Sequence, residues 1–269
     1  MPVIDTWVNI DIGGGGRPEF LQRVRQDYFK RDEEEFFRSY GAAEMLALMD
    51  RLEVEKAILT TAARHPDPKV LAFAKDHPDR FALGAQLDPT QPMKAVRALE
   101  RFVNDHGAVL ARITPFAIDV PPNAAIYYPV YTKCVELGIP ITINTGIPGP
   151  PAPGECQHPM HLDRVCLHFP DLVLVMAHGA DPWWGEASRL MLKYANLYLM
   201  TSAYLAKYLP PDFVHFMNTR GAHKVMFASD HPALPMERAV EEARKLELRP
   251  GVKEKFLYEN AQRVFFGGA

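Results

Sequence analysis

LVLVMAHGAD, residues 172–181, is the clearest indication of the fold in this chain. Its first six residues are apolar, which is short for a helix, and Pro170 and Asp171 precede it. A short, uninterrupted apolar run of this kind is typical of a strand buried on both faces of a parallel sheet. The run ends at His178, and the carboxyl ends of such strands carry the chemistry of α/β proteins. We therefore expect a buried strand that delivers His178 to a site; a core histidine satisfied by hydrogen bonds is the alternative.

The rest of the chain repeats this pattern of a short apolar run followed by a helical segment. Further strands are predicted at residues 3–10, 55–60, 81–87, 108–115, 139–146, 197–203 and 224–229. Helices are predicted at residues 42–52, 68–76, 91–104, 127–137, 161–169, 183–194, 237–246 and 252–266. Strands and helices that alternate about eight times predict an α/β fold, a (β/α)8 TIM barrel, as a single domain over residues 1–269. An open doubly wound sheet is the other architecture considered, but no GxGxxG fingerprint follows the first strand.

Composition and charge exclude several classes of partner. The chain has 269 residues, 48% hydrophobic, and a formal net charge of -3 without a basic run, so we expect no nucleic-acid partner. The first residues, MPVIDTWVNID, are acidic where a signal peptide is basic, and no apolar stretch approaches the roughly 20 residues of a membrane span. The three cysteines show no CxxC spacing. We therefore expect a cytoplasmic protein without a membrane partner.

Polar residues stand at the end of nearly every predicted strand. In a TIM barrel the carboxyl ends of all strands meet at one face, so these side chains should be neighbours. They are Trp7, Asn9, Gln86, Asp88, Arg112, Thr114, Asn144, Thr145, His178, Thr201, Ser202, Asp230 and His231.

The order and content of several stretches resemble one family, the amidohydrolase-related proteins of the amidohydrolase superfamily, also called amidohydrolase 2. The stretches are VIDTWVN, IPITINTG, FPDLVLVMAHGADPW, NLYLMTSAY, HKVMFASDHP and ENAQRVFFG, and they cover nearly the whole chain. The resemblance implies a TIM barrel. Members of this family include hydrolases, a lactonase that acts on a pyrone dicarboxylate, and decarboxylases of aromatic and semialdehyde acids. The resemblance therefore implies one of these activities, and the fold alone does not select which.

The chain departs from this family at its metal ligands. The resemblance implies His-x-His at the first strand, where this chain has Trp7 and Asn9, and a histidine at the fifth, where it has Asn144. Only His178 and Asp230 remain to hold zinc or another divalent metal. Indole is no ligand and a carboxamide is a weak one, so we predict a metal-independent site without a cofactor.

A replacement metal site is the alternative to that prediction. Cys156, His158 and His161 follow the fifth strand in the loop and the start of the next helix, and could bring new ligands over the barrel mouth. Their spacing, C-x-H-x-x-H, matches no common structural zinc pattern.

Asp230 and His178 are the predicted catalytic residues. Without metal, a carboxylate can accept a proton from water as attack occurs, so Asp230 is expected to act as general base, with His178 polarising the carbonyl or shuttling a proton. Arg112 is expected to bind a substrate carboxylate or a developing oxyanion, because its fork of donors matches two oxygens. A structural salt bridge of Arg112 with Asp88 or another acid is the alternative.

The remaining predicted site residues bind substrate. Asn9 and Asn144 would donate hydrogen bonds to a carbonyl, and Trp7 would offer a flat face to a planar substrate. Tyr204 and His231 are secondary candidates, and His231 could instead orient the Asp230 loop.

Three functions compete on these residues. The leading interpretation is a hydrolase of a small activated ester, lactone or 1,3-dicarbonyl compound, planar and anionic. The alternatives are a decarboxylase of a small aromatic or unsaturated acid and a non-catalytic ligand-binding protein. A homodimer is left open, because the aromatic pairs at 36–37, 127–128, 183–184 and 265–266 would serve an interface or pack under helices.

Overall fold

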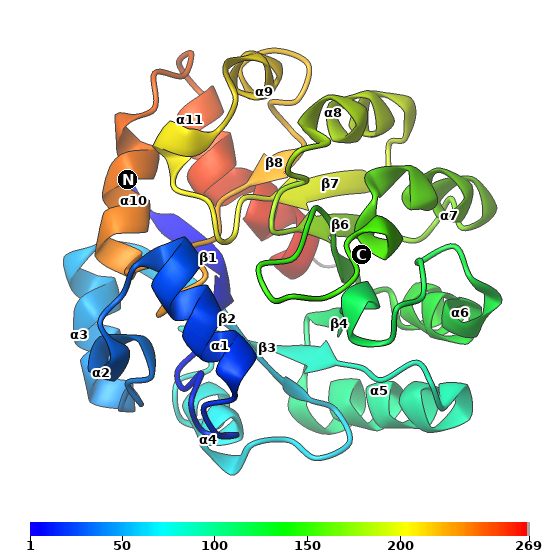
Figure 1. The fold of residues 1–269 in the computed structure, drawn as a ribbon, viewed down its shortest axis with the longest axis horizontal. Coiled ribbons are helices and arrows are strands. Elements are labelled where there is room, and N and C mark those ends of the chain that lie inside the picture. Colours follow the sequence, from blue (N-terminus) through cyan, green and yellow to red (C-terminus); the bar gives the residue numbers. More distant parts are fainter. Residues whose placement is uncertain (268–269) are drawn as a thin grey trace.

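Eight parallel strands make one sheet whose neighbours follow the order of the sequence. The computed structural model describes residues 1–267; residues 268–269 of the predicted domain lie outside it. The strands are β1 (Val3–Val8), β2 (Val54–Ala62), β3 (Phe81–Gln86), β4 (Leu110–Ile113), β5 (Ile141–Asn144), β6 (Leu174–Ala177), β7 (Leu197–Met200) and β8 (Val225–Met226). The segment after β8 then returns to β1, where Asp230 N–H donates to Trp7 O (3.0 Å) and Asn9 N–H to His231 O (2.8 Å). The predicted (β/α)8 TIM barrel is confirmed (Figure 1).

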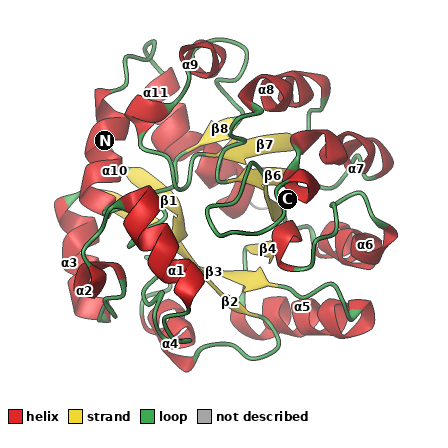
Figure 2. Cartoon of the chain, viewed as in Figure 1, coloured by secondary structure: helices red, strands yellow, loops and turns green. Residues whose placement is uncertain are grey.

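Helices form the outer ring around these strands (Figure 2). They are α3 (Ala42–Arg51), α4 (Pro68–Asp76), α5 (Pro92–His106), α6 (Tyr128–Leu137), α7 (Leu162–His168), α8 (Trp184–Lys193), α9 (Pro211–Met217), α10 (Met236–Lys245) and α11 (Val252–Glu254), with α2 (Glu33–Phe36) preceding them. The predicted helix at 252–266 is α11 continued by two π-helical segments, Lys255–Glu259 and Gln262–Phe266. The sequence analysis did not anticipate α9 or a helix over residues 19–29.

Alternation along each strand separates two hydrophobic cores. In β6, Leu174 and Met176 belong to the large core under the helices, whereas Val175 and Ala177 belong to a smaller core inside the barrel. The same alternation sends Ile58, Leu110, Met200 and Met226 inward. It follows that Arg112 and Asn144, each two residues beyond an inward-facing position, also point into the barrel.

Left-handed residues follow three of the strands at the barrel mouth. His178, Ala203 and Asp230, which come after β6, β7 and β8, have φ values of 63°, 68° and 67°. The predicted strands at 197–203 and 224–229 end early, at Met200 and Met226, whereas β2 runs beyond its predicted range of 55–60. Such backbone strain in non-glycine residues is characteristic of functional sites.

Two segments lie over the open end of the barrel. The first is α1 (Glu19–Arg23), continued by the π-helical Val24–Phe29, and the second is the Pro- and Gly-rich loop after β5 (Figure 1). They pack together, since a Cβ built on Gly149 of the loop would lie 3.6 Å from Val24 Cγ2. Of the helices described, none is long and apolar enough to cross a membrane.

Candidate active site

Arg112, Trp7 and His178 form a stack in the mouth of the barrel. The Arg112 guanidinium carbon lies 3.1 Å from the centroid of the Trp7 ring. The His178 ring meets Trp7 edge to face, with centroids 4.3 Å apart and an interplanar angle of 62°. A guanidinium over an indole face is the preferred geometry of a cation–π contact. The structure thus brings together three of the residues that the sequence predicts at the barrel mouth.

The Arg112 guanidinium is a buried cation without a full set of partners. The residue is 2% exposed, and its Nε donates one long hydrogen bond to Thr142 Oγ1 (3.4 Å). Its Nη2 has no hydrogen-bond partner among residues 1–267. Burial holds the pKa of Arg112 well below its usual value, and the charge of Asp230 partly restores it. A structural salt bridge with Asp88 is not formed, because Asp88 Oδ1 accepts from Thr90 N–H (2.9 Å) and Oγ1–H (2.6 Å).

Asp230 is the acid of the site. Burial raises its pKa to about 8, against the opposing effects of the Arg112 charge and a hydrogen bond from Asn9. Asn9 Nδ2 donates to Asp230 Oδ1 at 3.5 Å and to His231 O at 3.2 Å, so Asn9 acts on Asp230 rather than standing free for a substrate. At neutral pH a carboxyl with this pKa is mostly protonated. The residue predicted as a general base is thus set up as a proton donor.

Asp5 is a second buried carboxyl that the sequence analysis did not single out. It is 0% exposed, and its Oδ1 accepts from Ser229 N–H (2.9 Å) and Trp7 N–H (3.3 Å), which join β1 to the segment carrying Asp230. Burial raises the pKa of Asp5 to about 7, and the charge of Asp5 contributes to the raised pKa of Asp230. The signal was available, because Asp5 is an acid in the middle of an otherwise apolar run, VIDTWV.

Two further polar atoms at the strand ends are buried without partners. They are Asn144 Oδ1 on β5 and His178 Nδ1 after β6, and neither has a hydrogen-bond partner in the described chain. His178 N–H donates to Ser202 Oγ (2.9 Å), which fixes its backbone. Burial and the Arg112 charge lower the pKa of His178 to about 3, so the ring is neutral near pH 7. Unpartnered buried polar groups beside a buried cation are typical of a site that a ligand completes.

The residues at the family's metal positions do not fit a divalent ion. Trp7 supplies an indole, Asn9 and Asn144 supply carboxamides, and the Arg112 guanidinium already places a positive charge against Trp7. Within residues 1–267, no group of three or more His, Cys, Asp or Glu side chains comes together as a metal site.

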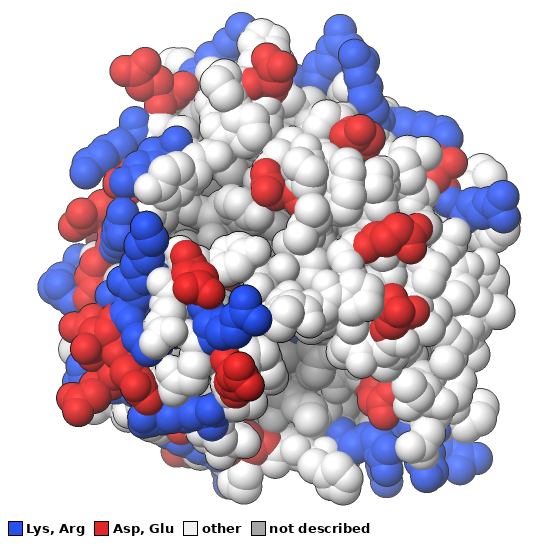
Figure 3. Space-filling view, viewed as in Figure 1, with Lys and Arg blue, Asp and Glu red and all other residues white. Residues whose placement is uncertain are grey.

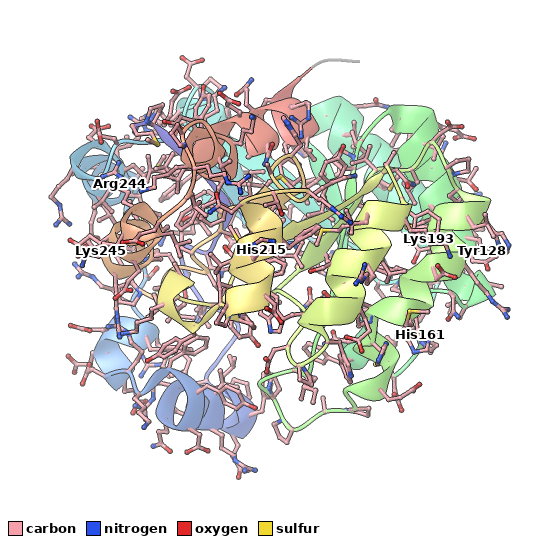
Figure 4. The ribbon with its side chains drawn as sticks, turned by 90° about the horizontal axis from the view of Figure 1, so that it is seen from above. Tyr128, His161, Lys193, His215, Arg244 and Lys245 are labelled. Atoms are coloured by element: carbon pink, nitrogen blue, oxygen red, sulfur yellow. The ribbon has the colours of Figure 1, made fainter. Side chains whose placement is uncertain are left out.

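The loop residues considered as replacement ligands are engaged elsewhere. Cys156 Sγ contacts Pro153 O (3.5 Å), and the His158 ring packs on Trp183 with centroids 4.3 Å apart. His161, labelled in Figure 4 on the outer side of the molecule, places Nε2 3.1 Å from Glu155 O.

Tyr204 and His231 lie outside the stack. Tyr204 packs against Trp184 (5.3 Å between centroids), and burial together with the nearby Asp181 raises its pKa. His231 is 2% exposed and its ring meets Tyr40, with centroids 4.6 Å apart. Its role as a secondary substrate ligand stays a prediction.

A pocket of about 520 Å³ opens at the ends of β2, β3 and β4, and none of Trp7, Arg112 and His178 is among the residues that line it. Gln86, the register partner of Arg112 on β3, lines it together with Thr114, and Leu87 and Ile118 supply apolar walls. In Figure 3 the hollow lies below α1 and its walls are mostly uncharged. Its size and lining suit a small, partly apolar ligand.

A comparison with known families identifies the family of this chain. The profile described as Amidohydrolase matches residues 4–267, nearly the whole sequence. The chain therefore belongs to the amidohydrolase family, as its resemblance implied. A search of curated proteins finds no match.

Solved structures with the same fold are numerous. An uncharacterised TIM-barrel protein from Bordetella bronchiseptica is 24% identical, with a TM-score of 0.82 and 98% of both chains covered. A 5-carboxyvanillate decarboxylase from Sphingomonas paucimobilis is 20% identical, with a TM-score of 0.72 over 98% of both chains. A dihydroxybenzoic acid decarboxylase from Polaromonas, solved with manganese and 2-nitroresorcinol, is 17% identical, with a TM-score of 0.74 over 98% of this chain and 96% of that one. At these identities the likeness establishes the fold.

Proposed function

We propose that this protein is a metal-independent decarboxylase of a small, planar aromatic or unsaturated acid. The observation that carries the proposal is the buried Arg112 guanidinium with its unpartnered Nη2, stacked on Trp7 at the barrel mouth. A buried cation is costly unless an anion pairs with it, which supports an anionic substrate. The structural relatives named as decarboxylases act on aromatic acids, which supports the same substrate class.

Arg112 takes the place of the metal in this proposal. Its fork binds a carboxylate oxygen and a neighbouring ring oxygen of the substrate, next to the face of Trp7. Asn144 lies on the adjacent strand β5, where its unpartnered Oδ1 can accept from a substrate hydroxyl. The neutral His178 ring packs edge to face against Trp7 and fixes the position of the indole.

Asp230 supplies the proton. It protonates the substrate carbon that bears the carboxylate; the carbon–carbon bond then breaks, its electron pair returns to the π system, and carbon dioxide leaves. When the ring oxygen is bound as the oxyanion, protonation of the carbon takes its charge away and loss of carbon dioxide returns it, and Arg112 stabilises that returning charge. Asp230, now a carboxylate, recovers its proton from solvent, so the balance is one acid anion and one proton giving the decarboxylated product and carbon dioxide.

Hydrolysis by Asp230 as general base, the leading interpretation of the sequence, fits the site less well. A general base must be ionised at the working pH, and burial raises the pKa of Asp230 to about 8. An acid donor needs the protonated form, which this pKa favours. The family includes hydrolases, so product analysis has to separate the two reactions.

The test is product analysis on a panel of dihydroxybenzoic acids and 5-carboxyvanillate. We expect release of carbon dioxide and, in deuterium oxide, one deuterium at the vacated carbon. Both should be lost in Asp230→Asn. Incorporation of oxygen from labelled water into a ring-opened or ester-cleaved product, without carbon dioxide, would establish hydrolysis instead.

A further inference from the structure

A second pocket, distinct from the barrel mouth, lies between α3 and α10. It measures about 340 Å³, and its walls include Arg38, Tyr40, Leu48, Arg51, Glu237 and His231. These two helices are neighbours at the edge of the molecule in Figure 1, and charged side chains crowd this side in Figure 3. Arg244 of α10, labelled in Figure 4, holds the two helices together by donating to Leu52 O (2.9 Å) and Glu53 Oε2 (2.8 Å).

His231 gives this pocket a buried hydrogen-bond donor without an acceptor. Its Nδ1 accepts from Met236 N–H at 3.4 Å. Because Nδ1 accepts this hydrogen bond, it carries no proton, and the ring proton belongs on Nε2. Nε2 is buried and has no partner among residues 1–267. A buried N–H of this kind is costly unless something accepts from it.

Two arginines add further donors around the pocket. Arg51 Nη2 pairs with Glu237 Oε1 at 2.9 Å, and Arg38 pairs with Glu44 while lying 5.2 Å from the centroid of Tyr40. Each guanidinium carries five N–H groups, so pairing with one carboxylate leaves some of its N–H donors unused. The Arg38 and Arg51 side chains are 55% and 63% exposed, so they can turn toward a ligand at little cost.

We propose that this pocket binds a small organic carboxylate as a second ligand of the protein. One carboxylate oxygen accepts from His231 Nε2–H, and the other accepts from Arg51 or Arg38. The apolar part of the ligand packs against Tyr40 and Leu48. His231 directly follows Asp230 and its carbonyl accepts from Asn9 N–H (2.8 Å), so the ligand acts on the segment that carries the acid of the barrel mouth.

Calorimetric titration with sodium benzoate tests the proposal. Benzoate carries the carboxylate that both pockets are expected to recognise, so the wild type should bind it at two sites. Arg112→Met removes the site at the barrel mouth and leaves one. In that background, Arg51→Met should weaken the remaining site by roughly tenfold, because a charge-assisted hydrogen bond is lost.

Three controls make the outcome specific. Arg97→Met replaces an exposed arginine of α5, away from this pocket, and should leave the titration unchanged. His231→Phe keeps a ring against Tyr40 but removes the donor, and should weaken the same site as Arg51→Met. Benzyl alcohol, which lacks the carboxylate, should not bind there.

Loss of all binding in Arg112→Met, or an unchanged second site in both Arg51→Met and His231→Phe, would overturn the second site. If the wild type has no benzoate site at the barrel mouth, the titration of Arg112→Met will match that of the wild type. Arg51→Met will still weaken benzoate binding at the second site. That result rejects the proposed decarboxylase site and retains the second carboxylate site.

Discussion

Asp230 and Arg112 are an acid and a base whose protonation the barrel interior has shifted toward neutrality. Burial raises the pKa of Asp230 to about 8 and lowers that of Arg112, while the charge of each opposes the shift of the other. Substrate binding changes this balance, because an anion that pairs with Arg112 leaves Asp230 protonated. The pair is therefore suited to accept an anion and return a proton.

The rate of decarboxylation should report the protonation of Asp230. If the protonated carboxyl is the donor, kcat/KM is level below about pH 8 and falls about tenfold per pH unit above it. A profile of kcat/KM against pH, measured across a series of buffers, checks this prediction. A rate that rises through the same range would identify a general base and contradict the donor role.

Replacing Arg112 should separate charge from geometry. Arg112→Met is expected to lower kcat/KM by roughly a hundredfold or more, the cost of losing one preorganised oxyanion partner. Arg112→Lys keeps the charge but loses the forked guanidinium and its stacking on Trp7. We therefore expect it to recover only a small part of the lost kcat/KM. Steady-state kinetics of the two variants measures both effects; full activity of the lysine variant would show that a point charge suffices.

The strand-end rule predicts which residues gather at the barrel mouth, because buried parallel strands leave only their carboxyl ends free for polar groups. Arg112 and His178 both contact Trp7 there. His231 instead packs against Tyr40, and its role as a secondary substrate ligand stays a prediction. The rule passed over Asp5 because this residue lies in the middle of β1 rather than at its end, although an acid within a largely apolar run marks a buried carboxyl.

The turn after β6 shows how an element positions the stack. His178 and Gly179 both have left-handed backbone, with φ values of 63° and 64°. A Cβ on Gly179 would lie 2.2 Å from Trp184 Cη2, so the ring of Trp184 packs directly against this glycine. The turn and the first residue of α8 therefore hold His178 in place together.

Gly179→Ala should accordingly destabilise the protein by about 2 kcal/mol or more, from backbone strain plus overpacking against Trp184. Gly185→Ala is the matched control, since that exposed glycine lies in α8 with open space around its Cβ position, and it should gain up to about 1 kcal/mol. Urea unfolding of the two variants measures the difference. Equal stability of both would contradict the packing described here.

Segments that cover the barrel were harder to predict than the barrel itself. Residues 19–29 combine a short α-helix with a π-helical continuation, a form that no simple periodicity marks. α9 spans only Pro211–Met217 after Pro210, too short for a periodic pattern to distinguish it from a loop. The strands and most long helices were predicted because each repeats one buried pattern.

The buried carboxyls should also shape the stability of the whole molecule. A carboxyl whose pKa rises on folding, as that of Asp230 does from 3.8 to about 8, favours the folded state at low pH and loses that contribution as pH rises from 4 to 8. Asp230→Asn removes the contribution of Asp230 to the pH dependence of stability and leaves the contribution of Asp5. The free energy of unfolding should therefore fall less between pH 5 and pH 9 in Asp230→Asn than in the wild type. Urea titrations at both pH values check this, and an equal fall would mean that Asp230 is not buried as an acid.

Metal independence of the site is tested by measuring metal content together with turnover of a dihydroxybenzoic acid, before and after treatment with chelator. We predict less than about a tenth of an equivalent of zinc, manganese or iron, and carbon dioxide release that chelator does not change, because the Arg112 guanidinium supplies the positive charge. About one equivalent of metal that Asp230→Asn loses, with activity abolished by chelator, would contradict it and restore the metal chemistry of the family to this site.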